Sequence, residues 1–273
     1  MRLPKFFDRF EEPEGWGPTQ GPTASQRAAN GANSLVNWAV AVLVALALLF
    51  SGFALFDALG VLFGANQAQA KLMEYKPGQD DLAEKFAELQ KINPDVCAWV
   101  EVDNTNISYP VCQGEKDFMY LDTDVYGKYS PAGSIFITAA SDRNFTDSYT
   151  ILYGHNMQEG VMFGDINKFL DEAFFSENVT ARIYLPDRIL ELETVAICEA
   201  DAYDQRLFTA PSFDMTKTVN RIYETALHQR GERLSAQEQV IALSTCGSGE
   251  TNQRHLLMLR VVGEKLAASS DGS

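Results

Sequence analysis

The feature that most limits what this chain can fold into is a long apolar run near its N-terminus. Residues 38–56 contain only two residues that are not apolar, and the wider block 35–64 contains one charge, Asp57. A run of about 20 such residues is long enough for a helix to cross a bilayer. A core helix of a soluble protein would carry a polar face, and a cleaved signal peptide has an apolar region of only about 7–15 residues, nearer the start. We therefore expect one transmembrane anchor at residues 34–64.

The segments on either side of this anchor differ in charge and composition. Residues 1–33 hold equal numbers of basic and acidic side chains among many Gly, Pro, Ser, Thr and Asn residues, which is typical of a flexible tail. Nearly all of the net charge of -15 lies after residue 65. We expect a single-pass protein of the cell membrane, with a cytoplasmic N-terminus and an extracellular acidic domain. The excess of acid argues against nucleic acid as a partner, because a phosphate backbone requires a basic surface.

Beyond the anchor, short apolar segments alternate with turn residues. An amphipathic stretch at 80–92 predicts a helix that ends before Pro94, and two alternating segments around residues 103–106 predict a hairpin. Helices are also expected at 161–175 and 215–230. Further strands are expected at 133–138, 149–153, 180–185, 189–200, 239–245 and 255–262. Many short strands with few helices indicate a mainly β fold, an antiparallel barrel or sandwich with helical insertions.

Two residues that could form a thiol nucleophile each follow an apolar strand. Cys246 ends one such segment and precedes a Gly/Ser loop, and His155 follows another. Strand ends of this kind can converge at one edge of a barrel, where a substrate can reach them. The thiolate is the reactive form of cysteine, and a nearby imidazole can take its proton or stabilise its charge. Arg254, at the head of the next strand, cannot act as a base but can donate hydrogen bonds to a developing oxyanion.

Each of these residues also has a plainer interpretation. A cysteine in a strand is usually a small core residue, and a histidine beside a turn is usually a surface residue. His155 precedes Cys246, whereas the cysteine comes first in papain-like enzymes. His228 is expected to be solvated, and His255 is expected to face the opposite way from its neighbour Arg254. With four Cys, three His and no C-x-x-C pattern, no structural metal site is expected.

The motifs around these residues resemble those of the sortases, the membrane-anchored cysteine transpeptidases of Gram-positive bacteria. The sequence Leu-Ser-Thr-Cys at 243–246, with Arg254 downstream, is similar to the family signature. The wider resemblance is to class B and covers roughly residues 80–265 in the family's order, with one departure at Ala242, where the family usually has Thr. It rests on the blocks at 93–96, 107–111, 113–114, 127–130, 133–136, 153–157 and 162–165, and on the expected helix at 215–230.

The resemblance implies a sortase-type β-barrel of about eight strands with helical insertions. It implies that Cys246 attacks the Thr carbonyl of a sorting motif near the C-terminus of a secreted protein and forms a thioester. His155 protonates the leaving amine, and Arg254 steadies the tetrahedral oxyanion. An amine of a peptidoglycan precursor or cross-bridge, or a pilin lysine, then displaces Cys246, and no cofactor is needed. The positions that match the family's substrate groove are Leu121, Leu207, Phe208, Ser244 and Thr245, for which a core or loop role is the alternative.

The resemblance also sets the domain boundaries. Residues 65–92 are expected to form a juxtamembrane segment and an N-terminal helix, 93–265 the catalytic domain, and 266–273 a disordered tail. Cell-wall anchoring of surface proteins is favoured over pilin polymerisation, because no lid motif or second apolar span is evident, although class B members can also build pili. An anchored module that only binds peptides is the non-enzymatic alternative.

Two further cysteines lie on the two strands of the predicted hairpin, where the family usually has apolar residues. If residues 103–106 form the loop, Cys97 and Cys112 are directly opposite each other, about 4.5–5.5 Å apart between Cα atoms. A disulfide is compatible with this separation, and the space outside the membrane permits one. The alternative is two reduced core residues, which is also the expectation for Cys198.

Overall fold

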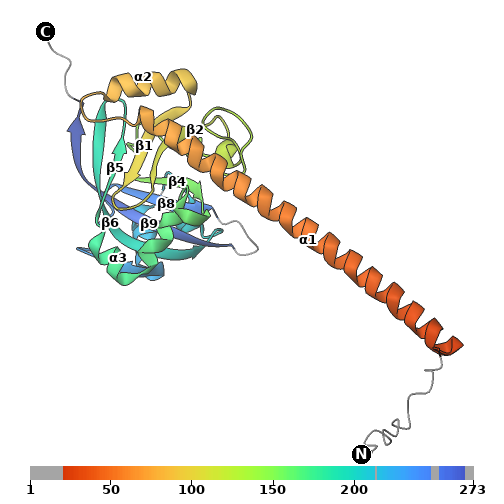
Figure 1. Ribbon diagram of the computed structural model, residues 1–273. Helices are drawn as coiled ribbons and strands as arrows, with labels where there is room; N and C mark the ends of the chain where they lie inside the picture. The colour runs from red at the N-terminus through yellow and green to blue at the C-terminus, as the bar shows by residue number, and fades with distance from the viewer. Residues whose placement is uncertain (1–20, 213, 247–251, 268–273) are drawn as a thin grey trace, which may run out of the picture. The chain divides into compact units, whose positions relative to one another are not determined.

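The apolar N-terminal run lies within one long helix. The computed structural model describes residues 21–212, 214–246 and 252–267 (Figure 1). The chain divides into two compact units, Met1–Phe56 and Asp57–Ser273. Helix α1 (Ala24–Leu72) is long and apolar enough to cross a membrane by length and composition, as expected from the sequence.

Helix α1 is longer than the predicted anchor at both ends. Residues 24–33 were expected to be part of a flexible tail but are helical, and residues 1–20 lie outside the described residues. The helix starts at a capping box: Thr23 donates its backbone N–H to Gln26 Oε1 at 2.9 Å, and Gln26 N donates to Thr23 Oγ1 at 3.4 Å. This reciprocal pair satisfies backbone groups that a helix start leaves open, which is why the helix begins in a polar sequence.

In the second unit, the end of α1 leads into a short connection and a further helix. Leu72, near the end of α1, is buried, and η1 (Met73–Tyr75) follows. Helix α2 (Leu82–Ile92) buries the face that its periodicity predicts, with Leu82, Phe86 and Leu89 all at most 1% exposed. Its expected position and its end before Pro94 are both confirmed.

The described part of the second unit contains nine strands in one sheet, which closes into an eight-stranded barrel. The order is β5-β1-β2-β3-β4-β8-β9-β6-β7, and an additional pairing of β5 with β6 closes the ring and leaves β7 as an extra strand on β6. The strands are β1 (Val96–Val102), β2 (Ser108–Gln113), β3 (Ile135–Ile137), β4 (Tyr149–His155), β5 (Thr180–Tyr184), β6 (Arg188–Asp201), β7 (Ala226–Gln229), β8 (Val240–Cys246) and β9 (Gln253–Leu266). The mainly β barrel with helical insertions is confirmed.

Most strand pairs are antiparallel, but two are parallel: β2 with β3, and β4 with β8. The pairing of β4 with β8 matters most, because parallel strands bring their carboxyl ends to the same edge. Strand β9 returns antiparallel to β8 and begins at that edge. The barrel therefore places the end of β4, the end of β8 and the start of β9 beside one another (Figure 1).

Two insertions differ from the helices expected at 161–175 and 215–230. The first is divided into the 3-10 segment η4 (Gly164–Leu170) and the short helix α3 (Glu172–Glu177), because Asp171 caps α3 by accepting from Phe174 N at 2.8 Å. The second forms helix α5 (Met215–Thr225) and then changes to strand β7, which pairs with β6. Hydrogen bonding to β6 thus ends a helical pattern that the sequence continues to 230.

The hairpin has the predicted register only in part, and of the two alternatives for Cys97 and Cys112 the structure shows reduced core residues rather than a disulfide. Ala98 pairs with Val111 as predicted, but a bulge at Cys97 shifts the register, so Cys112 faces Val96 instead. Cys97 belongs to the buried cluster that contains Ala98, whereas Cys112 belongs to the one that contains Val96. Both are free thiols and fully buried, as is Cys198. The bulge separates the two side chains, since it places them in different layers of the core.

Candidate active site at one edge of the barrel

The edge of the barrel brings together the backbones of the three residues predicted to be catalytic. His155 is the last residue of β4 and Cys246 the last of β8, and they are direct partners in the parallel ladder. The structure describes Cys246 by its backbone, and the Gly/Ser segment after it, residues 247–251, lies outside the described residues. Arg254 is the second residue of β9, two residues before Leu256, which pairs with Ser244 of β8. The predicted convergence of the strand ends is therefore confirmed.

A pocket of about 360 Å³ opens at this edge. Both His155 and Arg254 contribute to its wall, together with four of the five residues expected in a substrate groove. The lining consists of Phe118, Leu121, Tyr153, His155, Ala202, Phe208, Ser244, Thr245 and Arg254. Two of the three residues predicted to be catalytic thus border the cavity, and Thr245, which precedes the third in the chain, does so too.

Leu207 is the exception among the expected groove residues. Its side chain is 0% exposed and packs in the core, and its carbonyl oxygen accepts a hydrogen bond from Tyr149 Oη at 2.9 Å. The neighbouring Phe208 lines the pocket instead. The two residues are adjacent in the short helix α4 (Gln205–Phe208), so their side chains point about 100° apart and only one of them can face the cavity.

The ring of His155 is held from the loop on the other side of the pocket. Its Nε2 lies 2.8 Å from the carbonyl oxygen of Leu121, which ends the 3-10 turn η2 (Met119–Leu121). A carbonyl oxygen only accepts hydrogen bonds, so Nε2 is the nitrogen that carries the proton in this contact. Leu121 therefore contributes its backbone to the site as well as its side chain, and the backbone contact engages Nε2 of His155.

An aromatic cluster that no sequence motif marks contributes Phe118 and Tyr153 to the wall of the pocket. Phe118 packs edge-on against Tyr153, with ring centroids 5.8 Å apart, and Tyr153 stacks on Phe136 at 5.5 Å. Phe118 has a φ of 61°, a left-handed conformation that costs a residue with a side chain about 1–2 kcal/mol. It is also 51% exposed. The chain thus keeps a strained, exposed aromatic residue at the pocket, and no periodic pattern in the sequence marks it.

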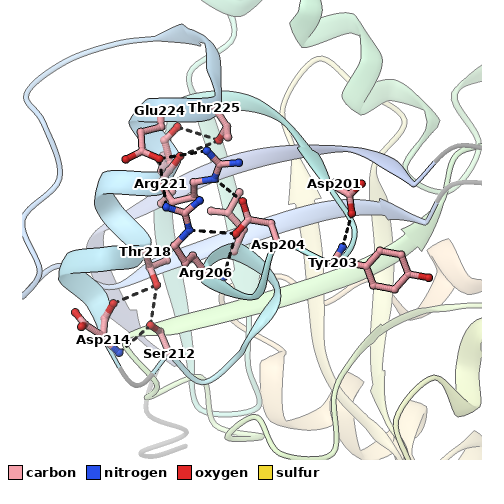
Figure 2. A network of polar contacts seen from close by, with 12 residues as sticks. Asp201, Tyr203, Asp204, Arg206, Ser212, Asp214, Thr218, Arg221, Glu224 and Thr225 are labelled. Carbon is pink, nitrogen blue, oxygen red and sulfur yellow. Dashed lines mark hydrogen bonds and ion pairs between the residues drawn. The ribbon is translucent and has the colours of Figure 1, made fainter.

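Helix α4, which carries Phe208, is fixed to α5 by a polar network (Figure 2). Asp204 caps α4 by accepting from Arg206 N at 3.1 Å, and its other oxygen accepts from Arg221 Nε of α5. Arg221 also reaches Glu224 at 3.2 Å. Burial would raise the pKa of the Asp204 carboxyl, but the hydrogen bonds and charges of Arg221 and Arg206 outweigh it and hold that pKa below its usual range. This network stabilises the pocket wall at Phe208.

The two other histidines lie away from the pocket. His255 faces away from Arg254 as predicted, and its ring contacts Asn167 and Glu199. His228, expected to be solvated, is partly buried, and its Nε2 lies 2.8 Å from the carbonyl oxygen of Leu170. Within the described part of the chain, no group of three or more His, Cys, Asp or Glu residues is arranged to hold a metal ion.

Comparison with known proteins gives the class to which this fold and site belong. No protein-family model matches the chain. The chain is 27% identical to the sortase B of Listeria monocytogenes over 182 residues. This match covers 66% of this chain and 74% of that protein. A solved class B sortase of Streptococcus pyogenes involved in pilus biogenesis is 31% identical, with a TM-score of 0.58 over 64% of this chain and 96% of the other. Sortase B from Bacillus anthracis gives a TM-score of 0.67 at 25% identity, over 75% of this chain and 99% of the other.

The closed barrel and the pocket at its edge define a sortase-type enzyme. The relatives are matched over most of their own length, so the likeness extends over the barrel as a whole. Within that class, the chain belongs to the class B sortases. This confirms the resemblance that its motifs indicated.

Proposed function

We propose that this protein is a membrane-anchored cysteine transpeptidase that joins secreted proteins to the cell wall. The observation that carries the proposal is the direct pairing of His155 with Cys246 at the edge where the pocket opens. A thiol nucleophile needs a base or a positive charge nearby, and this register brings the two backbones as close as neighbouring strands allow. Arg254 on the wall of the same pocket supplies the third group.

In the first half of the reaction, the thiolate of Cys246 attacks the carbonyl carbon of the Thr in a sorting motif. A C–S bond forms, and the carbonyl electrons move to oxygen, where the guanidinium of Arg254 donates hydrogen bonds. The C–N bond to the next residue then breaks. Its amine leaves with a proton from His155, and a thioester remains on Cys246.

In the second half, an acceptor amine attacks the thioester carbonyl and gives a proton to His155. The C–S bond breaks, a new amide forms, and the thiolate of Cys246 is restored. Because Nε2 of His155 is engaged with Leu121, we assign both proton transfers to Nδ1. The cycle is balanced without a metal or nucleotide.

The pocket supports a role for its apolar wall in binding the sorting motif. Leu121, Phe208 and Phe118 line the pocket together with His155, and Ser244 and Thr245, the two residues that precede Cys246, line it as well. A peptide bound in this pocket would have its scissile carbonyl between the end of β8 and Arg254. The amino-acid sequence of the preferred motif depends on the side chains that line this wall.

The proposed topology is single-pass. Residues 34–64 of α1 would cross the membrane, with residues 1–33 in the cytoplasm and the catalytic domain, 93–265, outside. The length and apolar composition of α1 support the span. The acceptor is then an amine of a peptidoglycan precursor or cross-bridge, which is available on the same side of the membrane.

A second candidate is pilin polymerisation, in which the acceptor is a lysine of another pilin subunit. One observation favours it: the Streptococcus pyogenes class B sortase that is 31% identical to this chain is involved in pilus biogenesis. The two candidates share the thioester and differ only in the amine that resolves it.

The experiment that tests the proposal uses the full chain in detergent with a panel of sorting-motif peptides. Mass spectrometry should detect a thioester with at least one peptide, and the Cys246→Ala variant should form none. A peptidoglycan-type amine and a lysine peptide, added in competition, then identify the acceptor. A wild-type protein that binds peptides but forms no thioester with any of them would support the non-enzymatic alternative.

A further inference from the structure

The residues next to the three proposed catalytic residues are connected to one another. Asn156 follows His155, Thr245 precedes Cys246, and His255 follows Arg254 in the chain. Of these three neighbours, only Thr245 lines the pocket. Their contacts meet at His255, on the side of β9 away from Arg254.

His255 is hydrogen-bonded directly to β8 and, through Asn167, to the residue that follows β4. On the β8 side, its backbone N–H donates to Thr245 Oγ1 at 3.2 Å. On the β4 side, its Nδ1 lies 2.8 Å from Oδ1 of Asn167 in η4, and Asn167 Nδ2 donates to Asn156 Oδ1 at 3.0 Å. One side chain, Asn167, therefore connects the start of β9 to the end of β4.

The ring of His255 has two different partners on its two nitrogens. Asn167 uses its amide N–H toward Asn156, so its Oδ1 accepts and His255 Nδ1 donates. On the other side, Nε2 faces Glu199 Oε2 of β6 at 3.4 Å, a longer and more exposed contact, with Glu199 39% exposed. We call these contacts the two branches of His255: the Nδ1 branch connects the ring to the end of β4 through Asn167, and the Nε2 branch connects it to Glu199 of β6.

These contacts lie where the regular ladder between strands stops. The described pairing of β8 with β9 ends at Ser244 and Leu256, and that of β4 with β8 ends at His155 and Cys246. Strand ends fray unless something else holds them. A displacement of about 1 Å at a reacting group can cost about 100-fold in rate, so a catalytic trio on three strand ends needs such support.

We propose that His255 is a positioning residue of this enzyme: through Asn167 and Asn156 it holds the end of β4, and with it the ring of His155, in register with Cys246 and Arg254. The proposal rests on the proposed function. It assigns the role to the Nδ1 branch and not to Glu199. Because His255, Asn167 and Asn156 do not line the pocket, their loss should lower kcat and leave KM nearly unchanged.

Two substitutions of His255 separate its two branches. The amide nitrogen of Asn lies near the position of Nδ1, and that of Gln lies near the position of Nε2. His255→Asn therefore keeps the bond to Asn167, whereas His255→Gln keeps only the contact with Glu199. We expect His255→Asn to retain kcat within about twofold, and His255→Gln to lose about tenfold or more, with KM within about twofold in both.

Three further measurements complete this test. Asn167→Ala should match His255→Gln, and the double variant should lose little more than either alone, because both interrupt the same connection. Glu199→Gln should behave like wild type, and thermal melting should show that all variants are folded. Equal kcat in His255→Asn and His255→Gln, or a loss confined to Glu199→Gln, would overturn the proposal.

A second readout does not depend on any substrate. The rate at which iodoacetamide alkylates Cys246, measured against pH, reports how His155 acts on the thiol. The profile of His255→Gln should shift toward that of His155→Ala, while His255→Asn should follow wild type. Coincident profiles of His255→Gln and wild type, or no effect of His155→Ala, would overturn the positioning role. The absence of a thioester in wild type would overturn only the proposed function.

Discussion

The Cα atoms of His155 and Cys246 are direct partners in the parallel pairing of β4 with β8. In a parallel pair both carboxyl ends lie at the same edge, so each residue follows its apolar strand into the same opening of the barrel. The histidine and the cysteine, far apart in the sequence, are thus brought together by backbone hydrogen bonds. The proposed chemistry depends on this register.

Removing Cys246 should stop acyl-enzyme formation, and removing His155 should slow it strongly. Cys246→Ala lacks the nucleophile, so we expect no thioester, and His155→Ala lacks the proton donor, so we expect a fall of about 100- to 10,000-fold. Mass spectrometry of the enzyme after incubation with a sorting-motif peptide measures both. Melting curves that coincide with wild type serve as the control, and a thioester at the normal rate in His155→Ala would contradict the role of His155.

Replacing Arg254 by lysine should separate the effect of its positive charge from the effect of its hydrogen-bond geometry. Lysine keeps the positive charge but cannot reproduce the planar, forked set of donors of a guanidinium. We expect Arg254→Lys to fold normally and to lose about 100-fold or more in kcat, the scale reported for a lost oxyanion donor. Peptide turnover followed by chromatography measures it, and wild-type turnover would exclude Arg254 from oxyanion binding.

The adjacent residues Leu207 and Phe208 should respond in opposite ways to truncation. Leu207 is fully buried, so Leu207→Ala should lower the free energy of unfolding by about 3 kcal/mol. Phe208 lines the pocket, so Phe208→Ala should raise KM about tenfold with a much smaller loss of stability. Chemical denaturation and peptide kinetics on the same two proteins check this, and the reverse pattern would place Leu207 in the groove.

The features that could be predicted from the sequence are those that depend on local patterns. Alternating or continuous apolar segments located β4 and β8, and the residues that end them are His155 and Cys246. The periodicity at 80–92 located α2 and its buried face. In each case the residues that decide the structure are neighbours in the chain, so the pattern itself carries the information.

The features that were missed depend on distant parts of the chain. Residues 226–229 continue a helical pattern, but hydrogen bonding to β6 makes them a strand. Leu207 and Phe208 are both apolar, and only the packing of α4 decides which one enters the core. The bulge at Cys97 likewise lies in the pairing of β1 with β2, and it changed the register on which the possible disulfide depended.

The three buried cysteines should behave as free, protected thiols. Burial raises the pKa of Cys97 and of Cys198 each to about 12 and that of Cys112 well above its usual value, so little thiolate is present at neutral pH. In the Cys246→Ala variant, a maleimide should label no thiol in the native protein and three after unfolding. Intact mass should be the same with and without reductant. A mass gain of two hydrogens on reduction would show that the protein contains a disulfide.

The ion pair between Asp204 and Arg221 should stabilise the protein in a pH-dependent way. The pKa of Asp204 is lower in the folded protein than in the unfolded chain, because the bonds from Arg221 and Arg206 outweigh burial. Its contribution is therefore complete above the unfolded pKa and is lost as the pH falls through the folded pKa. Asn caps helices about as well as Asp, so Asp204→Asn removes mainly the charge.

We expect Asp204→Asn to lose about 2 kcal/mol of unfolding free energy at pH 7. The difference from wild type should begin to shrink as the pH is lowered below about 4, where Asp204 is protonated first in the unfolded chain, and should disappear once the pH falls below the folded pKa. Urea denaturation of both proteins across this range measures it, with Asp187→Asn, whose side chain is 71% exposed, as the matched control. A difference that stays constant with pH would mean that the charge of Asp204 does not hold α4 to α5.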